Sequence, residues 1–310
     1  MTAASDELRA VGEALGSRAR PNAPLGVLTT YRVGGTAALL VESGDEDDLL
    51  AVARAVDGSS VPVLVLGRGS NLLVADRGFA GLVVALGDGF AGIEVQDHEV
   101  LAGAAVSLPV LARRTAAAGL SGLEWAVGVP GSVGGAVRMN AGGHGSDTSS
   151  TLVSYRWVDL RTARAAEAPA DQLHMAYRHT SLSASDVVVA ARFRLVGGDP
   201  EAGAAAIGDI VRWRRANQPG GSNAGSVFTN PDGDSAGRLI EEAGLKGFRL
   251  RSAQVSEKHA NFIQADEGGS ADDVADLIAQ VQATVAAKTG VALTTEVRMV
   301  GFDSAAPDQP

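Results

Sequence analysis

The stretch that most constrains the fold is GVPGSVGGAVRMNAGGHG, from Gly128 to Gly145, in which seven of eighteen residues are glycine. Glycine is favoured where the backbone adopts positive φ or closely approaches another group, and ordering it carries a high entropic cost. Apolar residues such as Val133 and Val137 are spaced through the stretch, whereas flexible linkers are mixtures of glycine and serine. We therefore expect an ordered, non-helical loop whose amides bind an anion, most plausibly a phosphate.

A second glycine loop, Gly67-Arg68-Gly69-Ser70-Asn71, follows the apolar run VPVLVL. It begins like a dinucleotide-binding fingerprint, but Leu72 replaces the third glycine and LLVAD has the pattern of a strand. No Gly-Lys-Ser/Thr follows, which excludes a Walker loop. The pattern predicts a strand-turn-strand with amides free to bind an anion, although an ordinary hairpin turn fits this loop equally well. Two such loops together suit two adjacent phosphates better than either loop alone.

Composition excludes several classes of protein. A net charge of −10 with 4% aromatic residues provides no basic surface, so we expect neither nucleic acid nor a membrane as partner. Cysteine is absent, which excludes disulfides, thiolate metal sites and cysteine nucleophiles, and five scattered histidines show no metal-ligand spacing. The N-terminus lacks the apolar run of a signal peptide or membrane anchor, so we expect a cytoplasmic enzyme without a metal.

The order of the predicted elements indicates an α+β protein. An N-terminal helical segment (1–27) precedes a mixed region (28–198) and a smaller C-terminal α/β domain (199–303), with a Gly/Ala-rich boundary near 197–206. The tail 304–310 is expected to be disordered. Apolar periodicity and capping residues predict helices at 45–56, 107–118, 236–243 and 270–290, and strands at 61–66, 72–76, 81–86, 151–160, 186–196, 260–265 and 291–302.

Six motifs occur in the order found in UDP-N-acetylenolpyruvoylglucosamine reductases, the flavoenzymes of peptidoglycan precursor synthesis. These motifs are LGRGSNLLV, GVPGSVGGAVRMNAGGHG, YRHTS, AGSVFTNP, KHANFI and EVRMVG. The sequence thus resembles this family over residues 28–302. The resemblance implies an FAD-binding domain of two subdomains, of the vanillyl-alcohol oxidase type, followed by the substrate domain. It also implies noncovalent FAD, NADPH as hydride donor, a UDP-sugar substrate and a monomer.

The resemblance places the flavin pyrophosphate between the two glycine loops. The implied cofactor-binding residues are Arg68, Gly69, Ser70, Asn71, Leu72, Gly128, Val129, Pro130, Gly131, Ser132, Gly134, Gly135, Asn140, Ala141 and Gly145. The implied substrate-binding residues are Tyr177, Arg214 and Asn230. Thr229 stands where many relatives have lysine, which leaves open the residue that contacts the substrate phosphate.

Three catalytic positions, Arg178, Ser226 and Glu296, are implied in the same way. Singly, each also fits an ordinary structural role: a surface cation, a turn residue and an ion-pair partner of Arg298. Their joint occurrence with two glycine loops favours catalysis. The short chain from Phe193 to Trp213 leaves no room for the extra tyrosine loop of one family branch.

The implied chemistry is a pair of half-reactions. NADPH reduces the flavin, and the enolpyruvyl ether then takes a hydride at C3 and a proton at C2. Ser226 would supply that proton, while Arg178 and a protonated Glu296 would stabilise the enolate. Two alternatives remain at this point: an oxidase or dehydrogenase of the same fold with another substrate, and a nucleotide-binding module without redox activity.

Overall fold

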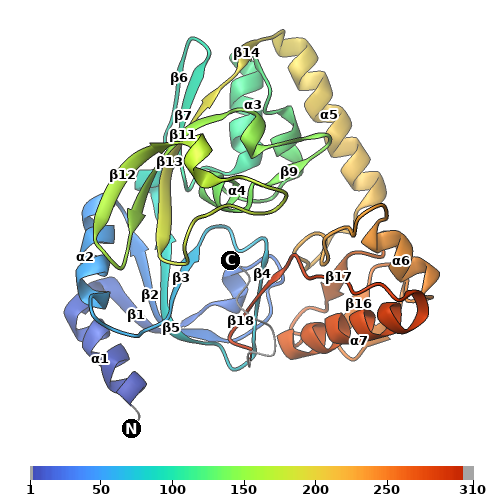
Figure 1. Ribbon diagram of the computed structural model, residues 1–310, viewed down its shortest axis with the longest axis horizontal. Helices are drawn as coiled ribbons and strands as arrows, with labels where there is room; N and C mark the ends of the chain where they lie inside the picture. The colour runs from blue at the N-terminus through green and yellow to red at the C-terminus, as the bar shows by residue number, and fades with distance from the viewer. Residues whose placement is uncertain (1–2, 303–310) are drawn as a thin grey trace.

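The computed structural model describes residues 3–302, so the tail predicted to be disordered lies outside the described residues. Two sheets with their covering helices occupy one side of the molecule, and a smaller α/β unit adjoins them (Figure 1). The predicted α+β class with a smaller C-terminal α/β unit is confirmed. Among the described residues, no helix is both long and apolar enough to cross a membrane.

The first sheet has four strands in the order β1-β2-β5-β3. Its strands and the helices beside it are β1 (Ala19–Pro24), β2 (Thr36–Ser43), β3 (Val63–Leu66), β5 (Phe79–Leu86), α1 (Ala3–Leu15) and α2 (Glu46–Val56). The predicted helix α2 begins after Asp45, whose Oδ1 accepts a hydrogen bond from the Asp48 amide at 2.9 Å. This cap and the buried apolar face of α2 explain why local sequence sufficed to locate the helix.

The sequence predicted a helical segment over residues 1–27. In the structure, residues 19–24 of this segment form strand β1 instead. Its sequence ARPNAP contains two prolines, which lack a backbone N–H and are accommodated at sheet edges. β1 pairs on one side only, antiparallel to β2. Because proline is uncommon in strands, the sequence pattern did not predict this edge strand.

The second sheet is antiparallel and has five strands in the order β12-β11-β13-β7-β6. Its strands and the helices that share its core are β6 (Ile93–Gln96), β7 (Glu99–Gly103), β11 (Leu152–Asp159), β12 (Arg164–Pro169), β13 (Asp186–Arg194), α3 (Leu108–Ala117) and α4 (Val133–Met139). One face of this sheet packs against α3 and α4. The opposite face, with the buried Val158 and Val187, packs against the core of the first sheet. The two sheets therefore share a hydrophobic core and form one packed unit.

The expectation of a non-helical loop between Gly128 and Gly145 is wrong for its central part. α4 begins after Ser132, whose Oγ accepts a hydrogen bond from the Gly135 amide at 3.4 Å. A Cβ added to Gly134 would lie 2.9 Å from the Ala104 Cβ, so glycine allows the helix to pack closely on the chain beneath it. That packing offsets the poor helix propensity of glycine. Of the glycines in this stretch, only Gly145 has positive φ, +86°.

A long helix, α5 (Pro200–Asn217), connects the sheets to the C-terminal unit (Figure 1). The sequence placed it in the substrate domain, but Ile207 belongs to the core beneath α3. A Cβ on Gly203 would lie 3.0 Å from the Ala116 Cβ. The first part of α5 therefore packs against α3, a helix of the two-sheet unit. β13 ends at Arg194 and α5 begins at Pro200, so the connection between them is short.

The C-terminal unit packs two helices with a three-stranded antiparallel sheet. Its elements are α6 (Ala236–Glu242), β15 (Arg249–Leu250), β16 (Ala253–Val255), β17 (Ile263–Ala265) and α7 (Ala271–Thr289). The predicted long helix is α7, with Ser270 as its N-cap and Gly290, at φ +74°, as its C-cap. Its apolar stripe, including Leu277 and Val281, is buried as the spacing predicted.

The end of the chain returns to the first glycine loop. The expected strand over 291–302 is shorter than predicted: only β18 (Arg298–Val300) is a strand, and it pairs in parallel with β4 (Leu72–Val74). β3 pairs with β5 instead of β4, so the glycine loop between β3 and β4 is not a hairpin turn. The β4–β18 pairing joins Asn71 to the C-terminal motif, because the Arg298 amide donates to the Asn71 carbonyl at 3.0 Å.

Candidate active site

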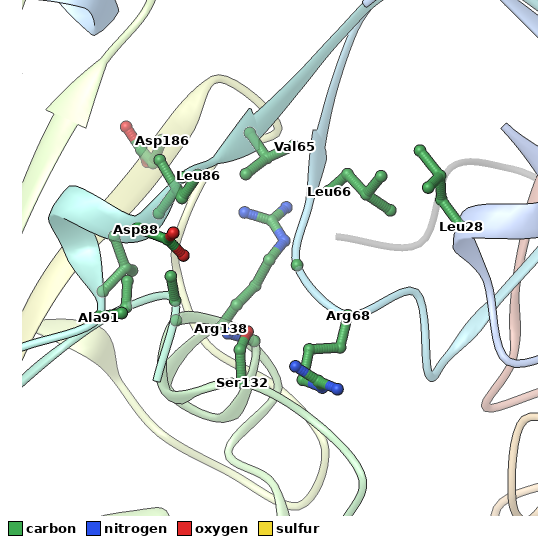
Figure 2. Close-up of a pocket in the computed structure, with 17 residues that line it drawn as sticks. Leu28, Val65, Leu66, Arg68, Leu86, Asp88, Ala91, Ser132, Arg138 and Asp186 are labelled. Carbon is green, nitrogen blue, oxygen red and sulfur yellow. Dashed lines mark hydrogen bonds between the residues drawn. The ribbon is translucent and has the colours of Figure 1, made fainter. Parts of the chain in front are cut away.

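Two adjoining cavities form a cleft between the glycine loops. The first has a volume of about 400 Å³ and is shown in Figure 2, and the second has a volume of about 380 Å³. Both are lined by Val65, Gly67, Arg68, Ser132, Gly135 and Arg138. The second cavity extends to the C-terminal unit, where Ser226 and Glu296 line it. The cleft therefore brings residues from three distant parts of the sequence together.

The backbone of the first loop requires glycine at two points. Gly69 has φ +61°, and a Cβ there would lie 2.6 Å from the Leu28 carbonyl oxygen. A Cβ on Gly67 would lie 2.7 Å from Ser132 Oγ. The two glycine loops thus approach so closely that a side chain would close the space between them.

The cleft collects nearly all of the predicted cofactor-binding residues. The second cavity is lined by Arg68, Gly69, Ser70, Asn71, Leu72, Gly128, Val129, Pro130, Gly131, Ser132, Gly135 and Ala141. Gly134 lines the first cavity. Asn140 and Gly145 line neither cavity.

Asn140, which the sequence predicted as a cofactor contact, uses its side chain for bonds within the protein. Asn140 is buried; its Nδ2 donates to the Ala176 carbonyl at 3.0 Å, and its Oδ1 accepts from the Ser149 amide at 3.0 Å. These bonds tie the end of α4 to the segment that precedes Arg178. These bonds help to position that segment, and a contact between Asn140 and a cofactor stays a prediction.

Arg178 is held rigidly at a tight turn, with φ +57°. Its Nε donates to Glu296 Oε1 at 2.8 Å, and its Nη2 donates to the Gly142 carbonyl at 3.0 Å. The ion pair joins residues that are 118 positions apart in the sequence. The guanidinium therefore lies at the second cavity in a fixed orientation.

The backbone around Glu296 is fixed from both sides of the cleft. Its amide donates to the Val227 carbonyl at 2.7 Å, and its carbonyl accepts from Asn71 Nδ2 at 2.9 Å. Burial raises the pKa of the Glu296 carboxyl, and the neighbouring Arg178 offsets this only in part. The protonated form is thus favoured over a wider pH range than for an exposed glutamate.

We expect Glu296→Gln to weaken the pH dependence of stability. Because the folded-state pKa of Glu296 is raised, its contribution to stability is fully present below the ordinary value of 4.5 and is lost as pH rises through the folded-state pKa. Glutamine does not ionise, so the variant should lose less stability over that pH range. Urea unfolding at a series of pH values measures this difference; parallel curves for both proteins would contradict a raised pKa.

Ser226 occupies a loop that the neighbouring core fixes. Asn261 accepts from the Phe228 amide at 3.0 Å and donates to the Phe228 carbonyl at 2.8 Å, while Gly225 adopts φ +80°. Val227 and Phe228 are buried, which anchors the loop behind the serine. Ser226 lines the same cavity as Arg178 and Glu296.

The predicted substrate-binding residues Tyr177, Arg214 and Asn230 also line the second cavity. The Arg178 guanidinium lies 4.8 Å from the centre of the exposed Tyr177 ring. Arg214 Nε donates to Gln218 Oε1 at 2.7 Å, and burial lowers the pKa of its guanidinium.

Thr229 does not line either cavity, and its hydroxyl donates to the Thr294 carbonyl at 3.3 Å. Two basic residues of the cleft, Arg138 and Arg298, were not among the predicted site residues although they lie in quoted motifs. The sequence did contain a signal for Arg138: it is a basic residue in the second glycine motif, GGAVRMN, which was already predicted to bind an anion.

Comparisons with known proteins identify the family. Residues 217–300 match the model described as UDP-N-acetylenolpyruvoylglucosamine reductase, C-terminal domain, and residues 37–165 match an FAD binding domain. The UDP-N-acetylenolpyruvoylglucosamine reductase of Gluconobacter oxydans is 42% identical over 293 residues, which cover 94% of each chain. The chain belongs to this reductase family. The reductase of Heliobacterium modesticaldum is 44% identical over 283 residues, covering 90% of this chain and 89% of that protein.

A solved structure supports the same conclusion for the fold. The UDP-N-acetylenolpyruvylglucosamine reductase of Thermus caldophilus aligns with a TM-score of 0.78 and 34% identity, covering 89% of this chain and 97% of that chain. The predicted family and two-part fold are confirmed.

The residues of the cleft fit FAD, the cofactor of this reductase. Glycine predominates where the two loops meet, and only Ser132 Oγ lies within 4 Å of a Cβ added to Gly135. The loop backbones thus border space that a larger residue would fill. Gly67, Gly69, Ser70, Gly131 and Ser132 would hold the cofactor there. Ser226 and Glu296 of the C-terminal unit line the same cavity.

Proposed function

We propose that Arg178, Ser226 and Glu296 carry the substrate half of the reductase reaction. The chain is an FAD-dependent oxidoreductase that reduces the enolpyruvyl ether of UDP-N-acetylglucosamine to UDP-N-acetylmuramate, with NADPH as hydride donor. The observation that supports the three roles is that these side chains, from distant segments, line one cavity of the cleft. When bound, FAD supplies the hydride that reduces C3 of the enolpyruvyl group.

Arg178 stabilises the negative charge that the reduction generates. Addition of hydride at C3 leaves an electron pair on C2 that is conjugated with the substrate carboxylate. A guanidinium donates charge-assisted hydrogen bonds to such oxygens, and its fixed position avoids reorganisation during the reaction. The bonds from Arg178 to Glu296 and Gly142 provide that fixed position.

Glu296 acts in its protonated form as a second donor to the enolate. A neutral carboxyl donates one O–H, whereas a carboxylate only accepts hydrogen bonds. The burial that raises the Glu296 pKa is consistent with this role. The glutamate also orients Arg178, whose Nε donates to Glu296 Oε1 at 2.8 Å. In the protonated carboxyl the carbonyl oxygen accepts this bond, while the O–H is left to donate to the enolate.

Ser226 donates the proton that completes the product. Its O–H bond breaks as the C2–H bond forms, and water restores the hydroxyl proton before the next turnover. A hydroxyl is a weak acid, so this transfer requires a strongly basic carbon within hydrogen-bonding reach. The rigid loop around Ser226 supports such close positioning.

The diphosphate of the substrate is bound by Arg214, with Tyr177 and Asn230 as further contacts. Arg214 is half-buried, lines the cavity and has the neutral Gln218 side chain as a hydrogen-bond partner. Its charge therefore replaces the lysine that is absent at Thr229. We also propose that the protein acts in the cytoplasm, because NADPH and the UDP-sugar are charged cytoplasmic metabolites, and that it acts as a monomer.

Absorbance of the purified protein tests the proposed activity. The oxidised protein should show a flavin spectrum that bleaches with NADPH under anaerobic conditions and returns on addition of the enolpyruvyl substrate. A colourless protein would indicate a nucleotide-binding module instead. Return of colour only with oxygen, after reduction by a small alcohol, would indicate an oxidase.

We expect Gly135→Val to abolish most FAD retention while the fold survives. Gly135 is exposed to the cleft, its φ is not positive, and an added Cβ would meet only Ser132 Oγ, at 3.5 Å. Valine also has a higher helix propensity than glycine, so its methyl groups should occupy cofactor space without unfolding α4. Flavin content per chain and circular dichroism measure the two effects.

Gly134→Val shows, by comparison, the effect of overpacking α4. Its Cβ would lie 2.9 Å from the Ala104 Cβ, so the variant should lose stability by about 1–3 kcal/mol through overpacking. Full flavin content in Gly135→Val would show that this face of α4 does not border the cofactor.

A further inference from the structure

Arg138 occupies the junction of the two cavities. Its side chain lines both of them, and Figure 2 shows it extending from α4 into the middle of the first cavity, toward Val65. This location places a guanidinium beside the two glycine loops. None of the proposed catalytic roles uses it.

The sequence of α4 explains why a long side chain reaches this position. Gly134 and Gly135 precede Arg138 by four and three residues, so the three residues share one helix face. Side chains on a helix incline toward its N-terminus, which directs Arg138 over the two glycines. The absence of side chains there leaves a path along the helix to the cleft.

The charge of Arg138 is incompletely compensated within the protein. Its Nη1 donates to the Ser183 carbonyl at 2.7 Å, a neutral acceptor. Asp88 and Asp186 line the same cavity, yet among the described residues no ion pair of Arg138 within 4.0 Å is present. Burial lowers the pKa of the Arg138 guanidinium, and the cation Arg298 lowers it further, whereas Asp186 opposes this shift. A half-buried cation beside another cation is stabilised by an anion.

We propose that Arg138 binds the phosphate groups of the flavin cofactor and thereby favours FAD over an uncharged flavin. The inference rests on the assignment of the cleft to FAD. Arg138 lies where the second cavity, which contains Ser226 and Glu296, meets the first, which contains neither. It shares this junction with Ser132 and Gly135 of the second glycine loop. Cofactor phosphates held by that loop fit this position better than those of the substrate or NADPH. Two neighbouring phosphates present several acceptor oxygens to a planar guanidinium.

Titration of the full-length chain with FAD and with riboflavin, which has no phosphate, tests this role. Arg138→Met should weaken FAD binding by about 10- to 100-fold, the effect of losing a charge-assisted hydrogen bond, and leave riboflavin binding unchanged. FAD binding by the original chain should also weaken more steeply with added NaCl than binding by the variant. Arg138→Lys should retain much of this salt dependence.

Arg161→Met is the structural control. Arg161 donates to the Ser59 and Val61 carbonyls and lines neither cavity, so its loss should lower stability without changing the ratio of FAD to riboflavin affinity. Equal weakening of both flavins by Arg138→Met would overturn the proposal, as would a raised KM for NADPH or the UDP-sugar with unchanged FAD affinity. Absence of flavin binding by the original chain would instead contradict the assignment of the cleft.

Discussion

Replacing Ser226 with alanine is expected to slow reoxidation of the reduced flavin by the enolpyruvyl substrate by about 10²- to 10⁴-fold, the usual contribution of a positioned general acid. Reduction by NADPH should proceed normally, since that step needs no proton at the substrate. The substitution removes one hydroxyl from a loop that Asn261 holds through the Phe228 backbone, so the site should stay folded. Stopped-flow absorbance resolves the two half-reactions.

Thr229→Ala provides the control for this experiment, because it removes a hydroxyl from the same loop that bonds to Thr294 and faces neither cavity. Both half-reactions should remain close to normal in that variant. Unchanged reoxidation in Ser226→Ala would assign Ser226 to a turn without catalytic function. Equal slowing of both half-reactions would indicate a distorted site.

Arg178→Met is expected to reduce the rate of the substrate half-reaction by about 10²- to 10³-fold, the range found when a donor to a developing oxyanion is removed. Methionine retains much of the side-chain volume but cannot donate to the enolate. The variant also loses the ion pair to Glu296, so the pKa of this carboxyl should rise further, because Arg178 lowers it in the original chain. Single-turnover rates over a range of pH measure both effects.

Arg178→Lys distinguishes charge from geometry. Lysine keeps the positive charge but lacks the planar fork that reaches both Glu296 and Gly142, so we expect partial recovery of the rate. A normal substrate half-reaction in Arg178→Met would contradict the proposed enolate stabilisation and leave only a structural role for the ion pair.

Local signals located several elements and many of the residues that line the cleft. α2 and α7 were predictable because each has a capping side chain at its start and a buried apolar stripe, features that depend on residues a few positions apart. The ordered motifs indicated the family and marked Ser226 and the glycine loops. The buried bonds of Asn140 to Ala176 and Ser149 could not be predicted, because they are formed by segments that local pattern does not connect.

By itself, the sequence determined the α+β class, the family and the residue types available for chemistry. The tertiary structure alone decided that α4 is a helix, since the close contact of Gly134 with Ala104 compensates for glycine's low propensity. It also decided the pairing of β4 with β18, which places Glu296 beside Arg178, and the position of Arg138 at the junction of the cavities. Long-range pairing and packing select among conformations that short-range propensity leaves nearly equal in free energy.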